Sequence, residues 1–96
     1  MSESANPTAE PLIPATFEML VMSLATQAQV HLGLFRLTEE PAELNLPGAR
    51  HAIDLLAMLL EKTKGNLTLE EKRLVENSVT ELRFRYVQAA GSGASA

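Results

Sequence analysis

Apolar residues recur at helical spacing in three segments of this chain, separated by runs of polar residues and proline. No stretch alternates between apolar and polar residues as a half-buried strand does, and no internal repeat is visible. The pattern therefore predicts an all-α fold. We expect a three-helix bundle, arranged helix–loop–helix–turn–helix over about 17–32, 46–64 and 69–89, and completed by oligomerisation.

The first helix is expected to begin after Thr16 as N-cap, with Glu18 near the positive end of the helix dipole. Helical spacing gives it two apolar faces. The core face would hold Phe17, Leu20, Val21, Leu24, Ala28 and Leu32, with Phe35 as a further candidate, and the opposite face Met19, Met22, Val30 and Gly33. One helix of a three-helix monomer seldom buries both sides, so the second face predicts self-association. The alternative is a central helix covered by its own neighbours and the loop at 34–45.

The second helix is predicted to follow Asn45 as N-cap, with Pro47 in the first turn, where its missing N–H costs nothing. Its core face is a broad arc made of Ala49, Ala52, Ile53, Leu55, Leu56, Leu59 and Leu60.

The third helix carries a narrow seam of coiled-coil spacing, followed by a weaker apolar stripe on its other side. The seam consists of Val75, Val79, Leu82 and Tyr86. Phe84 and Val87 point away from it and, with Leu69, form the stripe.

The turn between the last two helices carries the most specific local signal. Lys62 and Lys64 suit a helix C-terminus, and Gly65 can adopt the left-handed conformation that ends the helix. Thr68 and Glu71 match a capping box, in which each side chain accepts a hydrogen bond from the other residue's N–H.

The composition of the flanking segments limits the foldable part. Residues 1–14 are expected to be a disordered N-terminal segment, 15–89 the helical domain, and 90–96 a flexible tail of small residues. A domain of this size gains only about 3–5 kcal/mol from one core, so it usually needs a disulfide, a metal or a partner subunit. The sequence contains no cysteine, which excludes disulfides and thiolate metal sites.

Charge and hydropathy argue against two classes of partner. The net charge of −4 disfavours a general nucleic-acid or anionic-membrane binder. The uncharged run between Glu18 and Arg36 covers about 25 Å as a helix, which is short of a hydrocarbon core of ~30 Å. The N-terminus is acidic and lacks the basic region of a signal peptide. We therefore expect no membrane span and a cytoplasmic location.

No arrangement of residues predicts catalysis, a cofactor or a metal. His51 and Asp54 share a face of the second helix and His31 could join them, but the Glu-x-x-His pairs of di-iron bundles are absent. Neither Ser23 nor Ser78 has a base paired with it in the pattern. The expected protein is not an enzyme and binds no cofactor.

A nucleic-acid- or ribosome-associated role is the alternative. It would use the mildly basic surface of the second helix, turn and third helix, made of Lys62, Lys64, Lys72, Arg73, Arg83 and Arg85. The third helix opens with Glu70 and Glu71, whereas a recognition helix offers a basic N-terminal half. Nucleic acid is therefore an unlikely partner.

Four successive blocks, at 17–28, 49–56, 61–68 and 82–87, carry a resemblance to a known family. The chain resembles, over about residues 16–88, the short bacterial family of unknown function numbered 1844. The resemblance implies a small, cytoplasmic, helical bacterial protein, and it supplies no activity and no catalytic residues.

The sequence thus predicts a non-catalytic homo-oligomerisation or protein-interaction module, with a dimer as the first expectation and a hetero-protein partner as the alternative. Met19, Met22 and Val30 are the expected contact residues, and Phe84 and Val87 form the second candidate surface.

Overall fold

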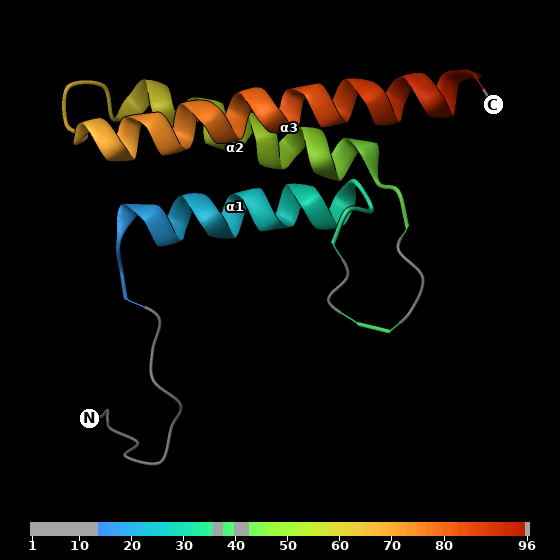
Figure 1. The fold of residues 1–96 in the computed structure, drawn as a ribbon, viewed down its shortest axis with the longest axis horizontal. Coiled ribbons are helices and arrows are strands. Elements are labelled where there is room, and N and C mark those ends of the chain that lie inside the picture. The colour runs from blue at the N-terminus through green and yellow to red at the C-terminus, as the bar shows by residue number, and fades with distance from the viewer. Residues whose placement is uncertain (1–13, 36–37, 40–42, 96) are drawn as a thin grey trace, which may run out of the picture.

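The computed structural model describes residues 14–35, 38–39 and 43–95. Within these ranges the chain forms three α-helices and no strand: α1 (Phe17–His31), α2 (Leu46–Lys62) and α3 (Leu69–Ser95). Successive helices run in opposite directions, so α1 and α3 are parallel, and each helix contacts the other two (Figure 1). The predicted all-α, three-helix fold is confirmed.

The first two helices begin where their polar caps predict. Thr16 Oγ1 accepts a hydrogen bond from the N–H of Met19 at 3.1 Å. Asn45 Oδ1 accepts one from the N–H of Gly48 at 3.0 Å, with Pro47 in the first turn. Each cap satisfies one of the N–H groups that a helix start leaves without a partner.

The predicted capping box joins α2 to α3. Thr68 Oγ1 accepts from the N–H of Glu71 at 3.1 Å, and Glu71 Oε1 accepts from the N–H of Thr68 at 2.9 Å. Before it, α2 ends at Lys62, where Thr63 Oγ1 donates to the carbonyl of Leu59 at 2.7 Å. Gly65 has a φ of +83°, the left-handed value that reverses the chain.

Gly65→Ala is expected to lower the free energy of unfolding by about 1 kcal/mol, because a Cβ is disfavoured at positive φ. Gly91→Ala is the matched control, since Gly91 is helical and an added Cβ would meet nothing within 4 Å. It should leave the stability unchanged or raise it by up to about 1 kcal/mol. Urea denaturation of both variants measures the difference. Equal effects of the two changes would contradict a strained turn.

The C-terminus of α1 is tied directly to the start of α2. The N–H of Asn45 donates to the carbonyl of His31 at 2.7 Å, which pairs one of the carbonyls that a helix end leaves free. A Cβ on Gly48 would lie 3.0 Å from His31 Cδ2. A residue without a side chain therefore allows the two helices to approach at this point.

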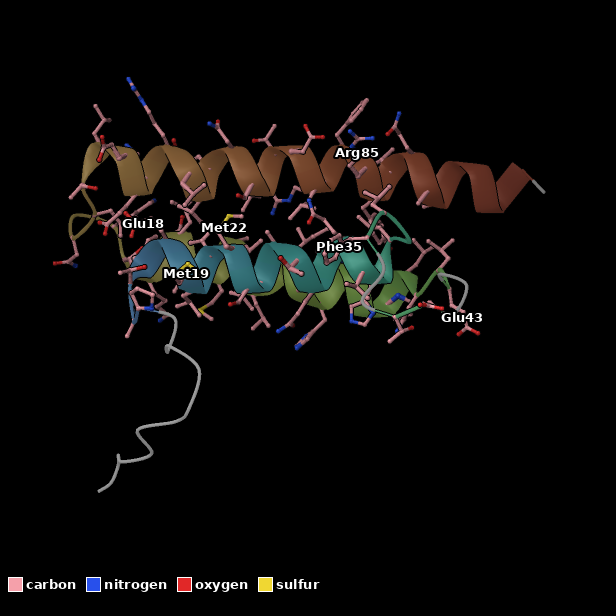
Figure 2. All side chains as sticks on the ribbon, turned by 60° about the horizontal axis from the view of Figure 1, so that its bottom comes forward. Glu18, Met19, Met22, Phe35, Glu43 and Arg85 are labelled. Atoms are coloured by element: carbon pink, nitrogen blue, oxygen red, sulfur yellow. The ribbon has the colours of Figure 1, made fainter. Side chains whose placement is uncertain are left out.

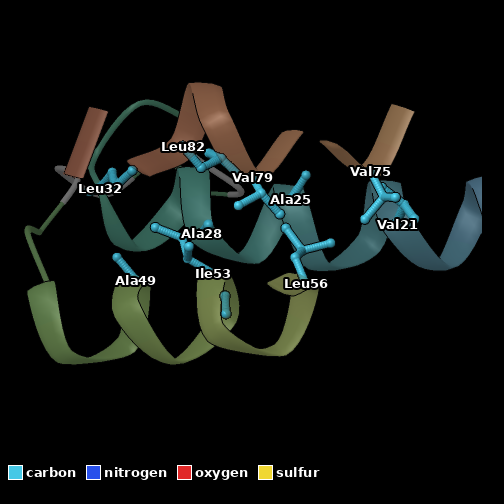
Figure 3. Close-up of a cluster of buried hydrophobic side chains, with 11 residues drawn as sticks. Val21, Ala25, Ala28, Leu32, Ala49, Ile53, Leu56, Val75, Val79 and Leu82 are labelled. Carbon is cyan, nitrogen blue, oxygen red and sulfur yellow. The ribbon is translucent and has the colours of Figure 1, made fainter. Parts of the chain in front are cut away.

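The core is a single cluster between the three helices. Leu56, Val21 and Val75 are its largest fully buried side chains. In Figure 3 the valines and Leu82 of α3 face α1, while Ala28 of α1 faces Ala49 and Ile53 of α2. Alanines line the contact of α1 with α2, so those backbones can lie close together. The complete buried set is Val21, Ala25, Ala28, Leu32, Ala49, Ala52, Ile53, Leu56, Val75, Val79 and Leu82.

The core face of α1 differs from the prediction at three positions. Leu20 is 46% exposed, and Phe35, which lies beyond the end of the helix, is 47% exposed, whereas Ala25 is buried. The buried residues of α1 follow 4-3-4 spacing from Val21 to Leu32, and Leu20 lies about 100° to one side of that line.

The third helix is longer than its pattern predicts. The sequence places its end near Ala89 and assigns 90–96 to a flexible tail, but the helix continues to Ser95 and its last turns extend past α2 (Figure 1). Adding residues to an existing helix costs little, since each one brings a backbone hydrogen bond. Residues 1–13 and 96 of the predicted terminal segments lie outside the described residues.

Candidate interaction surface

The three most exposed large apolar side chains of the described residues all belong to α3. Val87 is 67% exposed, Leu69 62% and Phe84 59%. The same helix buries Val75 and Val79 on its other side. Because the buried seam satisfies the contacts of α3 with α1 and α2, the described part of the chain leaves this stripe uncovered.

We define the outer face of α3 as the exposed residues opposite its buried seam. Between its apolar ends lie one cation and two small polar residues. It consists of Leu69, Arg73, Asn77, Thr80, Phe84 and Val87, all exposed. From Leu69 to Val87 it is about 27 Å long at 1.5 Å per residue.

Three charged side chains of α3 border this face on the side toward α2, namely Lys72, Glu76 and Arg83. Arg83 lines a hollow of about 300 Å³ together with Arg50, Ile53 and Val87. Glu76 lines a second hollow, of about 280 Å³, beside Leu60 and the α2–α3 turn. In the described ranges, neither Arg83 nor Glu76 forms an ion pair. Both are available to a partner.

The predicted contact residues of α1 are less exposed than those of α3. Met22 is 47% exposed, and Met19 and Val30 are half-buried. Figure 2 shows Met22 at the edge of α1 nearest α3, which is the inner side of α3. The fold therefore does not join the α1 residues to Phe84 and Val87, and they form two separate surfaces.

The basic residues of the alternative hypothesis do not form one surface. Lys64 pairs with Glu61 at 3.0 Å, and Arg85 Nε donates to Glu81 Oε2 at 2.8 Å. Arg83 lies on the α2 side of α3, whereas Arg85 lines a hollow on the α1 side with Leu32 and Leu34. The positive charge that phosphate groups would contact is thus divided between two sides of α3.

The candidate metal ligands are scattered in the part of the chain that the structure describes. His51 and Asp54 are exposed on α2, while His31 is half-buried at the end of α1. No three His, Asp or Glu side chains come together among the described residues. Asp54 instead lies 3.9 Å from Arg50, an exposed pair of small energetic value.

None of the three helices is both long enough and apolar enough to cross a membrane, as far as the described residues show.

The sequence pattern of α3 identifies its apolar ends, and it assigns Arg73 and Arg83 only to the basic surface of the alternative hypothesis. Nothing in the pattern connects Glu76 with Arg83. These two residues can be recognised only by their position, because on a helical wheel both lie directly beside the apolar stripe, on the same side of it. The sequence does not show that this side of α3 borders two hollows, because the hollows form only where α2 packs beside α3.

These features define a class: a small all-α domain whose longest helix presents a face with apolar ends that the described residues leave uncovered. The chain belongs to the family described as a domain of unknown function, DUF1844, whose model matches residues 14–88. This match confirms the resemblance in the sequence and covers α1, α2 and most of α3. No curated protein and no solved structure matches the chain.

Proposed function

We propose that this domain is a non-catalytic protein-interaction module that self-associates through the outer face of α3. The observation that carries the proposal is the exposure of Leu69, Phe84 and Val87 on one side of one helix. Burying a large apolar side chain contributes about 1.5–3 kcal/mol. A partner that covers all three therefore gains more than it could on any other helix of the described chain.

Oligomer formation also meets the needs of a small domain. The sequence contains no cysteine, so a partner subunit replaces the disulfides that stabilise many domains of this size. The lack of cysteine equally suits a reducing compartment, and we propose a cytoplasmic location. A hetero-protein partner would use the same face of α3.

Val87→Glu should weaken self-association about tenfold or more, because the change removes an apolar contact and places a carboxylate on the outer face. Met22→Glu should leave self-association unchanged, since Met22 lies on a separate surface of α1. The measurement is the elution volume of each variant in size-exclusion chromatography, compared with the unchanged protein at the same concentration.

The two substitutions are matched, since each puts a carboxylate at an exposed apolar position of a helix. Circular dichroism checks that both variants remain helical. If Met22→Glu dissociates the protein and Val87→Glu does not, the contact surface is on α1, and the proposal for α3 is wrong.

A further inference from the structure

We infer that the outer face of α3 is covered by the same face of a second copy, with the two α3 helices antiparallel about a two-fold axis. This inference rests on the proposed self-association and specifies its partner and orientation. In such a contact every pair of residues occurs twice, because residue i of one copy meets residue j of the other and the reverse.

The distribution of residues along the outer face favours the antiparallel arrangement. In a parallel pair each residue lies beside its own copy, so Arg73 would face Arg73 of the second copy. In an antiparallel pair, Leu69 can lie beside Val87 of the second copy. This register brings Arg73 within one residue of the level of Phe84 of the second copy and level with Arg83, which lies to one side, on the flank toward α2. A guanidinium over an aromatic ring is an attractive contact.

The charged flank supports the same register. When two antiparallel helices are related by a two-fold axis, a given flank of one helix lies next to the same flank of the other. The flanks of the two α3 helices that face α2 are therefore adjacent in the dimer. Glu76 and Arg83 both lie on this flank and are exposed. The register places Glu76 within one turn of Arg83 of the second copy. The resulting ion pairs select orientation more than they add affinity.

The surface area that a stable dimer buries is larger than the outer face of α3, so the contact must extend onto α2. The outer face alone is about 27 Å long and about 10 Å wide, or roughly 270 Å² in projection. A stable contact buries about 800 Å² on each partner. The second copy must therefore also cover the hollow between α2 and α3, where Ile53 and Arg50 adjoin Val87.

Thiol cross-linking tests the orientation, because the sequence has no cysteine and any introduced thiol is unique. Asn77 lies next to the expected two-fold axis, whereas Gln88 lies near one end of the face. In the antiparallel arrangement, two Gln88 positions are about 30 Å apart, and Gln88 of one copy lies within two residues, or about 3 Å, of the level of Glu70 of the other. All three residues are exposed.

The experiment treats Asn77→Cys, Gln88→Cys and Glu70→Cys with a short bis-maleimide at a concentration where light scattering shows a dimer. We expect Asn77→Cys to cross-link to itself. Gln88→Cys and Glu70→Cys should not cross-link alone and should cross-link to each other when mixed. Ser23→Cys, at an exposed position of α1, is the control and should stay uncross-linked.

Each other result overturns the inference in a recognisable way. A dimer in which Gln88→Cys cross-links to itself is parallel. A dimer in which none of the α3 thiols react with each other uses another surface. A parallel dimer would still support self-association through α3. A dimer through another surface would support self-association but contradict the role of α3. A protein that is monomeric at every concentration contradicts both the inference and the proposed function.

Discussion

Leu56→Ala is expected to lower the free energy of unfolding by about 2–5 kcal/mol. Leu56 is fully buried and is the largest such side chain of the core. It belongs to the buried cluster that also contains Ala25, Ala28, Ala49 and Ala52, whose methyl groups are too short to fill the space it leaves. A domain of this size has about 3–5 kcal/mol from its core, so the variant should be largely unfolded at 25 °C.

The measurement is urea denaturation followed by circular dichroism. Met58→Ala is the control, since Met58 lies two positions away on the same helix and is 47% exposed. Its effect should stay below about 1 kcal/mol. If Leu56→Ala shifts the urea midpoint no further than Met58→Ala does, the three helices do not share the core described above.

Phe84→Glu is expected to raise the dissociation constant of the dimer at least about 100-fold. The ring is 59% exposed in the single chain, so the change should alter the stability of the helices themselves by no more than about 0.5 kcal/mol. In a two-fold contact the substitution acts twice. It removes two buried rings and the two cation–π contacts with Arg73, and each 1.4 kcal/mol lost is a factor of ten.

Sedimentation equilibrium of the variant and the unchanged protein gives both dissociation constants. Gln27→Glu adds the same charge at an exposed position of α1 and should leave the constant within a factor of two. A dissociation constant for Phe84→Glu equal to that of Gln27→Glu would show that the ring lies outside the contact. A loss of helical signal would instead assign Phe84 a role in folding.

Features set by short-range physics could be predicted from the sequence. The caps at Thr16 and Asn45 and the capping box at Thr68 depend on residues three apart, and all three form as expected. The seam of α3 also follows from its spacing alone, since Val75, Val79 and Leu82 are buried and Tyr86 is half-buried. Each of these features needs no knowledge of the other helices.

Features that depend on helix packing could not be read in this way. Both apolar faces of α1 suit a core by composition, and the burial of Ala25 with the exposure of Leu20 depends on how α1 is turned toward its two neighbours. Likewise, the sequence offers two surfaces for a partner, on α1 and on α3. The exposure of Val87 compared with the half-burial of Met19 and Val30 is a property of the folded bundle.

The central claim is that the domain self-associates through an apolar face, and its mass in solution tests this most directly. Light scattering after size exclusion, over a series of protein concentrations at low and high salt, should give a mass rising to twice the 10.4 kDa of the chain. Because Leu69, Phe84 and Val87 supply most of the affinity in this account, the dimer should persist at high salt. A well-folded protein of 10.4 kDa at every concentration would contradict the claim.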